Sequence, residues 1–243
     1  MMEDRPMTAA AEAPPTSHDG ADPATGLDNP RALQILSTEH WALLAARSLV
    51  YNEAFARAGM FLSFLSASLV ALGLIATATG FSDGFLLIAA VLLAIDVFIG
   101  YASLGRISSA SVEDILYLQG MNRIRHAYVE IAPATAPYFL SGHHDDVVSV
   151  VAMYGPVVSS PVRNIIHGFT TTPGMVGVIT NAVGGALAGV LTMLATHDPS
   201  AAAIVGIVAF LVQAVVLLVV VQQTIFRFWG RLQPMFPKDR GKQ

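Results

Sequence analysis

Four long apolar runs dominate the pattern of hydrophobic and polar positions along the chain. They cover residues 58–79, 85–105, 174–195 and 201–226, and their only charged side chain is Asp96. At about 1.5 Å of rise per residue, a helix of 21 residues spans roughly 31 Å, which is the thickness of the hydrocarbon core of a bilayer. The pattern therefore predicts an all-α membrane protein with four transmembrane helices in two hairpins.

The first two runs continue into segments that carry charges but keep a helical pattern. In residues 31–57 and 106–132, contact positions recur at spacings of three and four, which indicates helices that bury one stripe. We expect these segments to pack as an antiparallel, coiled-coil-like stalk about 35–40 Å long on the cytoplasmic side. The alternative is two separate amphipathic helices lying on the membrane. The expected contact positions are Trp41, Leu44, Ser48, Tyr51, Phe55, Ala58, Leu62 and Leu65, and Ile107, Ala110, Asp114, Tyr117, Met121, Ile124, Tyr128 and Ile131.

The remaining segments lack long apolar runs. Residues 1–30 are acidic and rich in alanine and proline, which predicts a disordered tail. Five prolines interrupt residues 133–173, where we expect a cytoplasmic linker with short interfacial helices, one of them at 161–168. Residues 227–243 form a basic cytoplasmic tail.

The distribution of lysine and arginine predicts the orientation in the membrane. Of the 13 positive residues, four precede the first run, four lie in the central segment and five lie in the tail. The two short turns, at 80–84 and 196–200, have none. Because positive charge marks the cytoplasmic side, we expect both termini to be cytoplasmic and the protein to lie in the inner (plasma) membrane of the cell.

Composition narrows the function classes. Charged residues make up only 12% of the chain, against about 25% in soluble domains. The absence of cysteine excludes disulfides, thiolate zinc sites and cysteine nucleophiles. A net charge of −4 argues against nucleic-acid binding. No phosphate loop and no nucleophile–base motif is present, so we expect neither an enzyme nor a cofactor.

Three polar side chains within the runs are candidates for a functional site. Asp96 lies near the middle of the second run, Asn181 in the third and Gln213 in the fourth. An ionisable group at this depth is costly, so Asp96 either lines a proton or cation path or forms a hydrogen bond that fixes helix packing. Gly184, Gly185 and Gly189 fit the small-residue spacing that lets helices approach closely in lipid.

Residues 143–146 contain residue types that bind metals, namely His143, His144, Asp145 and Asp146. Adjacent residues on a helix point about 100° apart and do not converge on one ion without help from elsewhere. We therefore interpret them as a solvated helix start rather than a metal site. Elsewhere, His126 and Glu130 are spaced as an i,i+4 pair, which is a plain surface ion pair, a pH-sensitive pair or a docking face.

Residues 39–41, 122–128 and 143–146, together with the four spans, resemble an uncharacterised family of bacterial multipass membrane proteins. That resemblance implies a membrane location and no specific activity. Two functions remain open. The first is an oligomeric pore or transport-type protein in which Asp96 faces the path. The alternative is a non-conducting membrane scaffold that binds a cytoplasmic protein through its stalk. Expected partners are the lipid bilayer and further copies of the chain.

Overall fold

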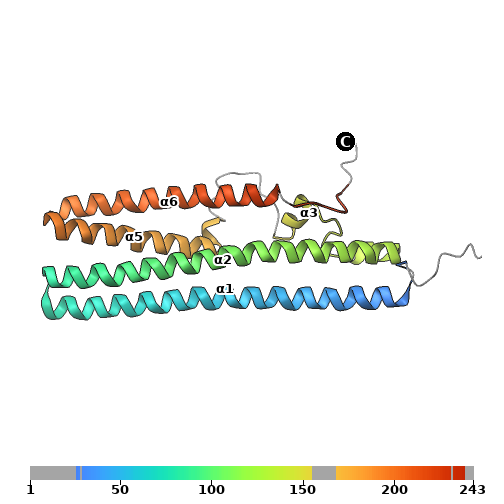
Figure 1. Ribbon diagram of the computed structural model, residues 1–243, viewed down its shortest axis with the longest axis horizontal. Helices are drawn as coiled ribbons and strands as arrows, with labels where there is room; N and C mark the ends of the chain where they lie inside the picture. Colours follow the sequence, from blue (N-terminus) through green and yellow to red (C-terminus); the bar gives the residue numbers. More distant parts are fainter. Residues whose placement is uncertain (1–25, 28, 155–167, 231, 239–243) are drawn as a thin grey trace, which may run out of the picture.

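The computed structural model describes residues 26–27, 29–154, 168–230 and 232–238, and within them the chain is helical without strands. Four of the helices are long and apolar enough to cross a membrane, which confirms the predicted all-α class. The described elements are α1 (Pro30–Thr79), α2 (Asp83–Ile131), the 3-10 helix η1 (Pro133–Tyr138), α3 (Val147–Ala152), α5 (Thr172–Thr196) and α6 (Pro199–Trp229) (Figure 1).

The helix ends follow local chemistry. Pro30 occupies the first turn of α1, and the Asn29 side chain accepts a hydrogen bond from the Arg31 N–H. The turn into α2 depends on Gly80, whose φ of 62° is favourable only for glycine. Ser82 then caps α2 by accepting from the Phe85 N–H. These caps define the ends of the helices. Between them, α1 and α2 are each continuous and run in opposite directions side by side (Figure 1).

The long helices lie in the order α1, α2, α5 and α6, with α1 and α6 at the two edges (Figure 1). Most of the buried side chains belong to α2, which packs against both α1 and α5. In α6, by contrast, none of the described side chains is buried. The chain therefore forms a layer with apolar edges, an arrangement compatible with lipid or further protein around it.

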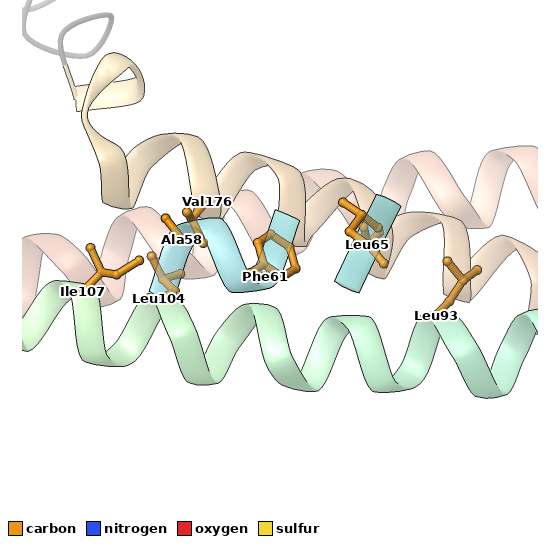
Figure 2. Close-up of a cluster of buried hydrophobic side chains, with 8 residues drawn as sticks. Ala58, Phe61, Leu65, Leu93, Leu104, Ile107 and Val176 are labelled. Atoms are coloured by element: carbon orange, nitrogen blue, oxygen red, sulfur yellow. The ribbon is translucent and has the colours of Figure 1, made fainter. Parts of the chain in front are cut away.

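The main core lies where α1, α2 and α5 meet. Phe61 of α1 is completely buried there, and Leu104 and Ile107 of α2 pack near it (Figure 2). A Cβ atom on Gly100 would lie 2.5 Å from the Thr180 hydroxyl and 3.0 Å from the Phe61 ring, so only glycine fits at this crossing. The other core residues are Ala58, Leu65, Leu93, Val176 and Val183.

The predicted packing glycines lie where α5 meets α6. A Cβ atom on Gly185 would approach the Gly206 carbonyl oxygen to 2.8 Å, and one on Gly189 would approach the Ala202 carbonyl to 3.1 Å. Gly184 faces the Gln213 side chain. Backbone therefore lies directly against backbone at this contact, as the small-residue spacing suggests.

The stalk is the pair of segments 31–57 and 106–131 (Figure 1). On α2, most of the expected positions are indeed buried. On α1, the expected stripe is wrong in the stalk half, because Trp41 is 70% exposed and Phe55 is 59% exposed. The helix is turned by one residue, so that α2 meets the neighbouring positions instead. These inner-seam residues are His40, Leu43, Arg47, Val50 and Ala54.

Two physical contacts explain this rotation of α1. Asp114 lies within the α2 stripe and binds Arg47, and Gly120 leaves room for the Leu43 side chain, whose Cδ1 would be 3.1 Å from a Cβ there. Two further expectations, the tail at 1–30 and the interfacial helix at 161–168, fall largely outside the described residues.

We predict that Gly185→Ala destabilises the packing of α5 against α6. The added methyl group must displace the Gly206 carbonyl, and overpacking of this kind costs about 1–3 kcal/mol. Thermal unfolding in detergent, followed by circular dichroism, measures the effect. Gly73→Ala is the matched control, because a Cβ at Gly73 meets nothing within 4 Å. An equal melting temperature for the two variants would contradict the close approach.

Candidate functional site

The stalk contains a polar centre around Asp114, which is only 2% exposed. Its carboxylate accepts hydrogen bonds from Arg47 and Tyr51 of α1 and from Tyr154, which follows α3. Three separate segments of the chain therefore converge on one carboxylate. A buried charge needs this kind of satisfaction, because an unpaired one is strongly destabilising.

The electrostatics of this centre follow from burial and from the carboxylate. Burial lowers the Arg47 pKa, but the hydrogen bond and charge of Asp114 outweigh burial and raise it. Burial raises the pKa of Tyr154, and the hydrogen bond and negative charge of Asp114 raise it further. Burial and the same charge also raise the pKa of Tyr51. Arg47 therefore stays charged and the two phenols stay protonated as donors at neutral pH.

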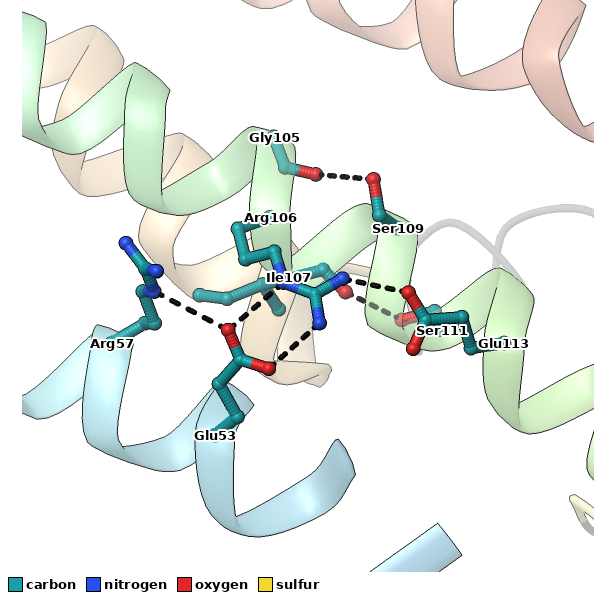
Figure 3. Close-up of polar contacts among 8 residues, drawn as sticks. All are labelled: Glu53, Arg57, Gly105, Arg106, Ile107, Ser109, Ser111 and Glu113. Carbon is teal, nitrogen blue, oxygen red and sulfur yellow. Dashed lines mark hydrogen bonds and ion pairs between the residues drawn. The ribbon is translucent and has the colours of Figure 1, made fainter. Parts of the chain in front are cut away.

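A second ionic cluster lies at the base of the stalk, directly after the apolar part of α2. Arg106 donates to both oxygens of Glu53 at 2.9 and 2.7 Å and to Glu113 at 2.7 Å (Figure 3). Glu53 also pairs with Arg57, one helical turn later on α1, at 3.6 Å. The hydrogen bond from Arg106 lowers the pKa of Glu53. This cluster links α1 to α2 where the apolar stretches of both helices end.

Asp145 fastens the C-terminal segment to α2. Its buried carboxylate accepts from Arg123 at 2.7 Å and from the backbone N–H groups of Met235 and Phe236 at 2.9 and 2.8 Å. Burial raises the pKa of this carboxyl, but the hydrogen bonds from Met235, Arg123 and Phe236 outweigh burial and hold the pKa below its ordinary value. Asp146 caps α3 and accepts from the Lys238 N–H.

The intramembrane candidate Asp96 is enclosed rather than open, with 1% of its surface exposed. Its Oδ1 accepts a hydrogen bond from Ser68 of α1 at 3.1 Å. Its Oδ2 has no hydrogen-bond partner among the described residues, and no ion pair in that part of the chain involves Asp96. Asp96 thus links α2 to α1 and keeps one free acceptor.

The other two intramembrane candidates meet each other through a tyrosine. The Tyr101 hydroxyl lies 2.9 Å from both Asn181 of α5 and Gln213 of α6. Both partner atoms are carbonyl oxygens, so the single phenol proton is shared between the Asn181 Oδ1 and the Gln213 Oε1. This network links α2, α5 and α6, so Asn181 and Gln213 do not join Asp96.

Sequence reasoning missed several of these residues. No feature of the sequence distinguishes Tyr101 from any other tyrosine near the end of an apolar run. Asp114 was expected in the α2 stripe, but its role as a buried ion-pair centre was missed, although a carboxylate in an otherwise apolar stripe must be buried with a partner. Ser68 of α1 is the hydrogen-bond partner of Asp96.

The metal-type residues divide into two groups. Asp145 and Asp146 are engaged by the backbone of the C-terminal segment. His143 and His144 instead lie beside His126 of α2, and one ring nitrogen from each comes within 4.8 Å of the others. Adjacent histidines do not converge on one ion by themselves. His126 of the stalk helix α2 supplies the additional imidazole beside them. Burial and the charges of His144 and His126 lower the His143 pKa.

Comparisons with protein-family models, curated proteins and solved structures found no match. The resemblance to a family of bacterial multipass membrane proteins stays a prediction. The functional argument consequently rests on the geometry of the chain itself.

We predict that Asp114→Asn destabilises the stalk by about 2–3 kcal/mol, because it leaves the partly buried Arg47 without its counter-charge. Chemical or thermal unfolding in detergent measures the loss. Glu113→Gln is the matched control, since the Glu113 carboxylate, which pairs with Arg106, is far more exposed than that of Asp114, and ion pairs contribute less where solvent reaches them. Equal effects of the two substitutions would contradict a central role for Asp114.

Proposed function

We propose that this chain is a non-conducting membrane scaffold that associates with further copies of itself through its stalk. The observation that carries the proposal is a second stripe on α1 whose side chains are exposed, although the Tyr51 hydroxyl also donates to Asp114. Trp41, Leu44, Ser48, Tyr51 and Phe55 follow the inner-seam positions by one residue each, so they lie about 100° around the helix from α2. We call these five residues the outer stripe.

The outer stripe has the spacing of a helix contact. Its positions recur at three and four residues, which is the pattern by which one helix buries a seam against another. Trp41 precedes the apolar run at 58–79 by 17 residues, which places it about 25 Å of helix away from that run. Lipid therefore does not cover Trp41, and a protein surface is the better occupant for an exposed indole.

A second copy of the chain fits this stripe best. Copies with the same orientation in a membrane are related by an axis along the membrane normal, so their α1 helices run parallel. Each residue of the outer stripe then faces its own counterpart, and the stripe is complementary to itself. Ser48, as a small polar residue in the middle of the seam, would favour one register.

The arrangement of the polar groups in the spans supports a scaffold over a pore. Asp96 is enclosed between helices, and Tyr101, Asn181 and Gln213 bond to one another across three helices. Hydrogen bonds of this kind fasten helices together in lipid. The polar side chains are thus engaged in holding the layer together, and the stalk offers the free surface.

The proposal includes the orientation expected from the positive charges. The turns at 80–82 and 197–198 would lie on the far side of an inner (plasma) membrane, and the stalk, α3 and the C-terminal segment on the cytoplasmic side. The absence of lysine and arginine from both turns supports this orientation.

We predict that the variant Ser48→Cys cross-links into dimers in native membranes. The chain has no cysteine of its own, so a single new thiol reports one position. In a parallel pair of α1 helices the two thiols face each other across the seam, and mild oxidation or a short bis-maleimide joins them. Non-reducing or denaturing gels measure the dimer fraction.

Ala42→Cys is the matched control for this cross-link. Ala42 is also exposed on α1, but six residues before Ser48 place it about 120° around the helix. A helix is roughly 10 Å across, so thiols at position 42 would lie too far apart for efficient cross-linking. We therefore expect at least about fivefold less dimer from Ala42→Cys than from Ser48→Cys. Equal yields would refute association through the outer stripe.

A second candidate function, an oligomeric pore or transport protein, is favoured by one specific observation. The Asp96 Oδ2 atom is buried and has no hydrogen-bond partner among the described residues. A spare carboxylate oxygen at this depth could bind a proton or a cation in transit. The arrangement in one chain supports this candidate less, because Asp96 is enclosed by packing.

Flux measurements in proteoliposomes separate the two candidates. For a scaffold, we expect no proton or cation flux above that of empty vesicles, for wild type and for Asp96→Asn alike. Asp83→Asn is the matched control, because Asp83 lies in the exposed first turn of α2. Wild-type flux that Asp96→Asn abolishes and Asp83→Asn preserves would favour the pore and overturn the scaffold proposal.

A further inference from the structure

Three imidazoles from two parts of the chain converge beside the stalk. His126 belongs to α2, whereas His143 and His144 lie in the segment before α3. The ring centroids of His143 and His144 are 4.3 Å apart, and those of His126 lie 5.8 and 6.1 Å from them. One nitrogen from each ring lies within 4.8 Å of the other two.

Two of these rings bury a nitrogen without a partner. The Nδ1 atoms of His126 and His144 are inaccessible to solvent and have no hydrogen-bond partner among the described residues. An unpaired buried nitrogen is costly. Both atoms belong to the three-ring cluster, so one ligand between the rings would satisfy both of them at once.

The carboxylate of Glu130 lies beside the His126 ring. Glu130 lies one turn after His126, and its Oε1 is 3.5 Å from the His126 Nε2. In metal sites, a ligating histidine commonly donates its second N–H to a carboxylate, which fixes the tautomer and orients the ring. His126 could therefore present Nδ1 to an ion while Nε2–H faces Glu130.

The surroundings hold the three rings in place. Phe236 stacks on the His126 ring with centroids 4.2 Å apart, and Asp145 fastens the Phe236 backbone. The Asn122 side chain donates to the His144 carbonyl at 2.8 Å. On the other side, His143 and His144 border a cavity of about 690 Å³, which gives an ion a way in from solvent.

The distances suit a small tetrahedral ion after a modest closure. Zinc–nitrogen bonds of about 2.0–2.1 Å at tetrahedral angles place ligand nitrogens about 3.3 Å apart. The rings must therefore approach one another by at most about 1.5 Å, which side-chain rotation can supply. The carboxylates of Asp145 and Asp146 are engaged by backbone N–H groups, so the donor set is three imidazoles.

We propose that His126, His143 and His144 bind one zinc ion, with the fourth position open to water or to a ligand from the neighbouring cavity. Imidazole nitrogens suit zinc, and three histidines with an open fourth position are an established coordination for it. Binding of the ion joins α2 to the segment before α3. The inference does not depend on the proposed scaffold function.

The test uses the full-length protein, purified in detergent and stripped with a chelator, and titrated with zinc alone by calorimetry. We expect one zinc ion per chain. We expect His126→Ala and His143→Ala each to weaken binding at least about tenfold, as is typical when a metal site loses a contributor. Cobalt titrated in place of zinc should give the visible absorption of a four-coordinate ion in the wild-type chain only.

His40→Ala is the matched control, since His40 also lies half-buried on the stalk and stacks on Tyr128, away from the cluster. It should bind zinc like the wild type. Thermal unfolding without metal checks that each variant is folded, and zinc should raise the melting temperature of the wild type. Wild-type binding no tighter than that of a His126→Ala/His143→Ala double variant would overturn the site. A loss of binding in His40→Ala equal to that in His143→Ala would overturn it as well.

Discussion

The packing of the stalk depends on one buried carboxylate. Asp114 lies in the seam of α2, and a charge in that position must meet a cation and further donors. Arg47 satisfies this requirement only if α1 is rotated so that Arg47, rather than Trp41 or Phe55, faces α2. The rotation that pairs the charges thereby turns the aromatic side chains of α1 outward. The outer stripe exists because electrostatic satisfaction outweighed the burial of the larger apolar residues.

The same carboxylate fixes more than the helix pair. Tyr154, which follows α3, donates to Asp114 of α2. Asp145, which precedes α3, binds Arg123 of α2 and the backbone of the C-terminal segment. Segments that are distant in sequence are thus held against α2. Because α2 also supplies most of the buried side chains between α1 and α5, it is the central element of the described chain.

Sequence patterns predicted the elements far better than the contacts between them. Each apolar run lies within one of the four long helices, because length and composition decide whether a helix can span lipid. Proline and glycine marked the ends at Gly80 and Pro133 correctly. The partner face of α1 was predicted wrongly, since a hydrophobic pattern cannot weigh an ion pair with Asp114. The contacts of Tyr101 with Gln213 and of His126 with His143 join residues 112 and 17 positions apart in the sequence. A pattern of neighbouring residues does not predict contacts across such separations.

The division of polar groups between span and stalk connects the geometry to the proposed function. In the apolar parts of α2, α5 and α6, the Tyr101, Asn181 and Gln213 side chains bond to each other. In the proposed membrane location, a change in their arrangement would break hydrogen bonds that lipid cannot replace. On the exposed surface of the stalk, broken contacts can be replaced by water, so rearrangement there costs less. The outer stripe and the histidine cluster both lie in the stalk, on the part of the molecule where binding can alter structure without disturbing the span. A surface that recruits further copies is therefore better placed on the stalk than between the spans.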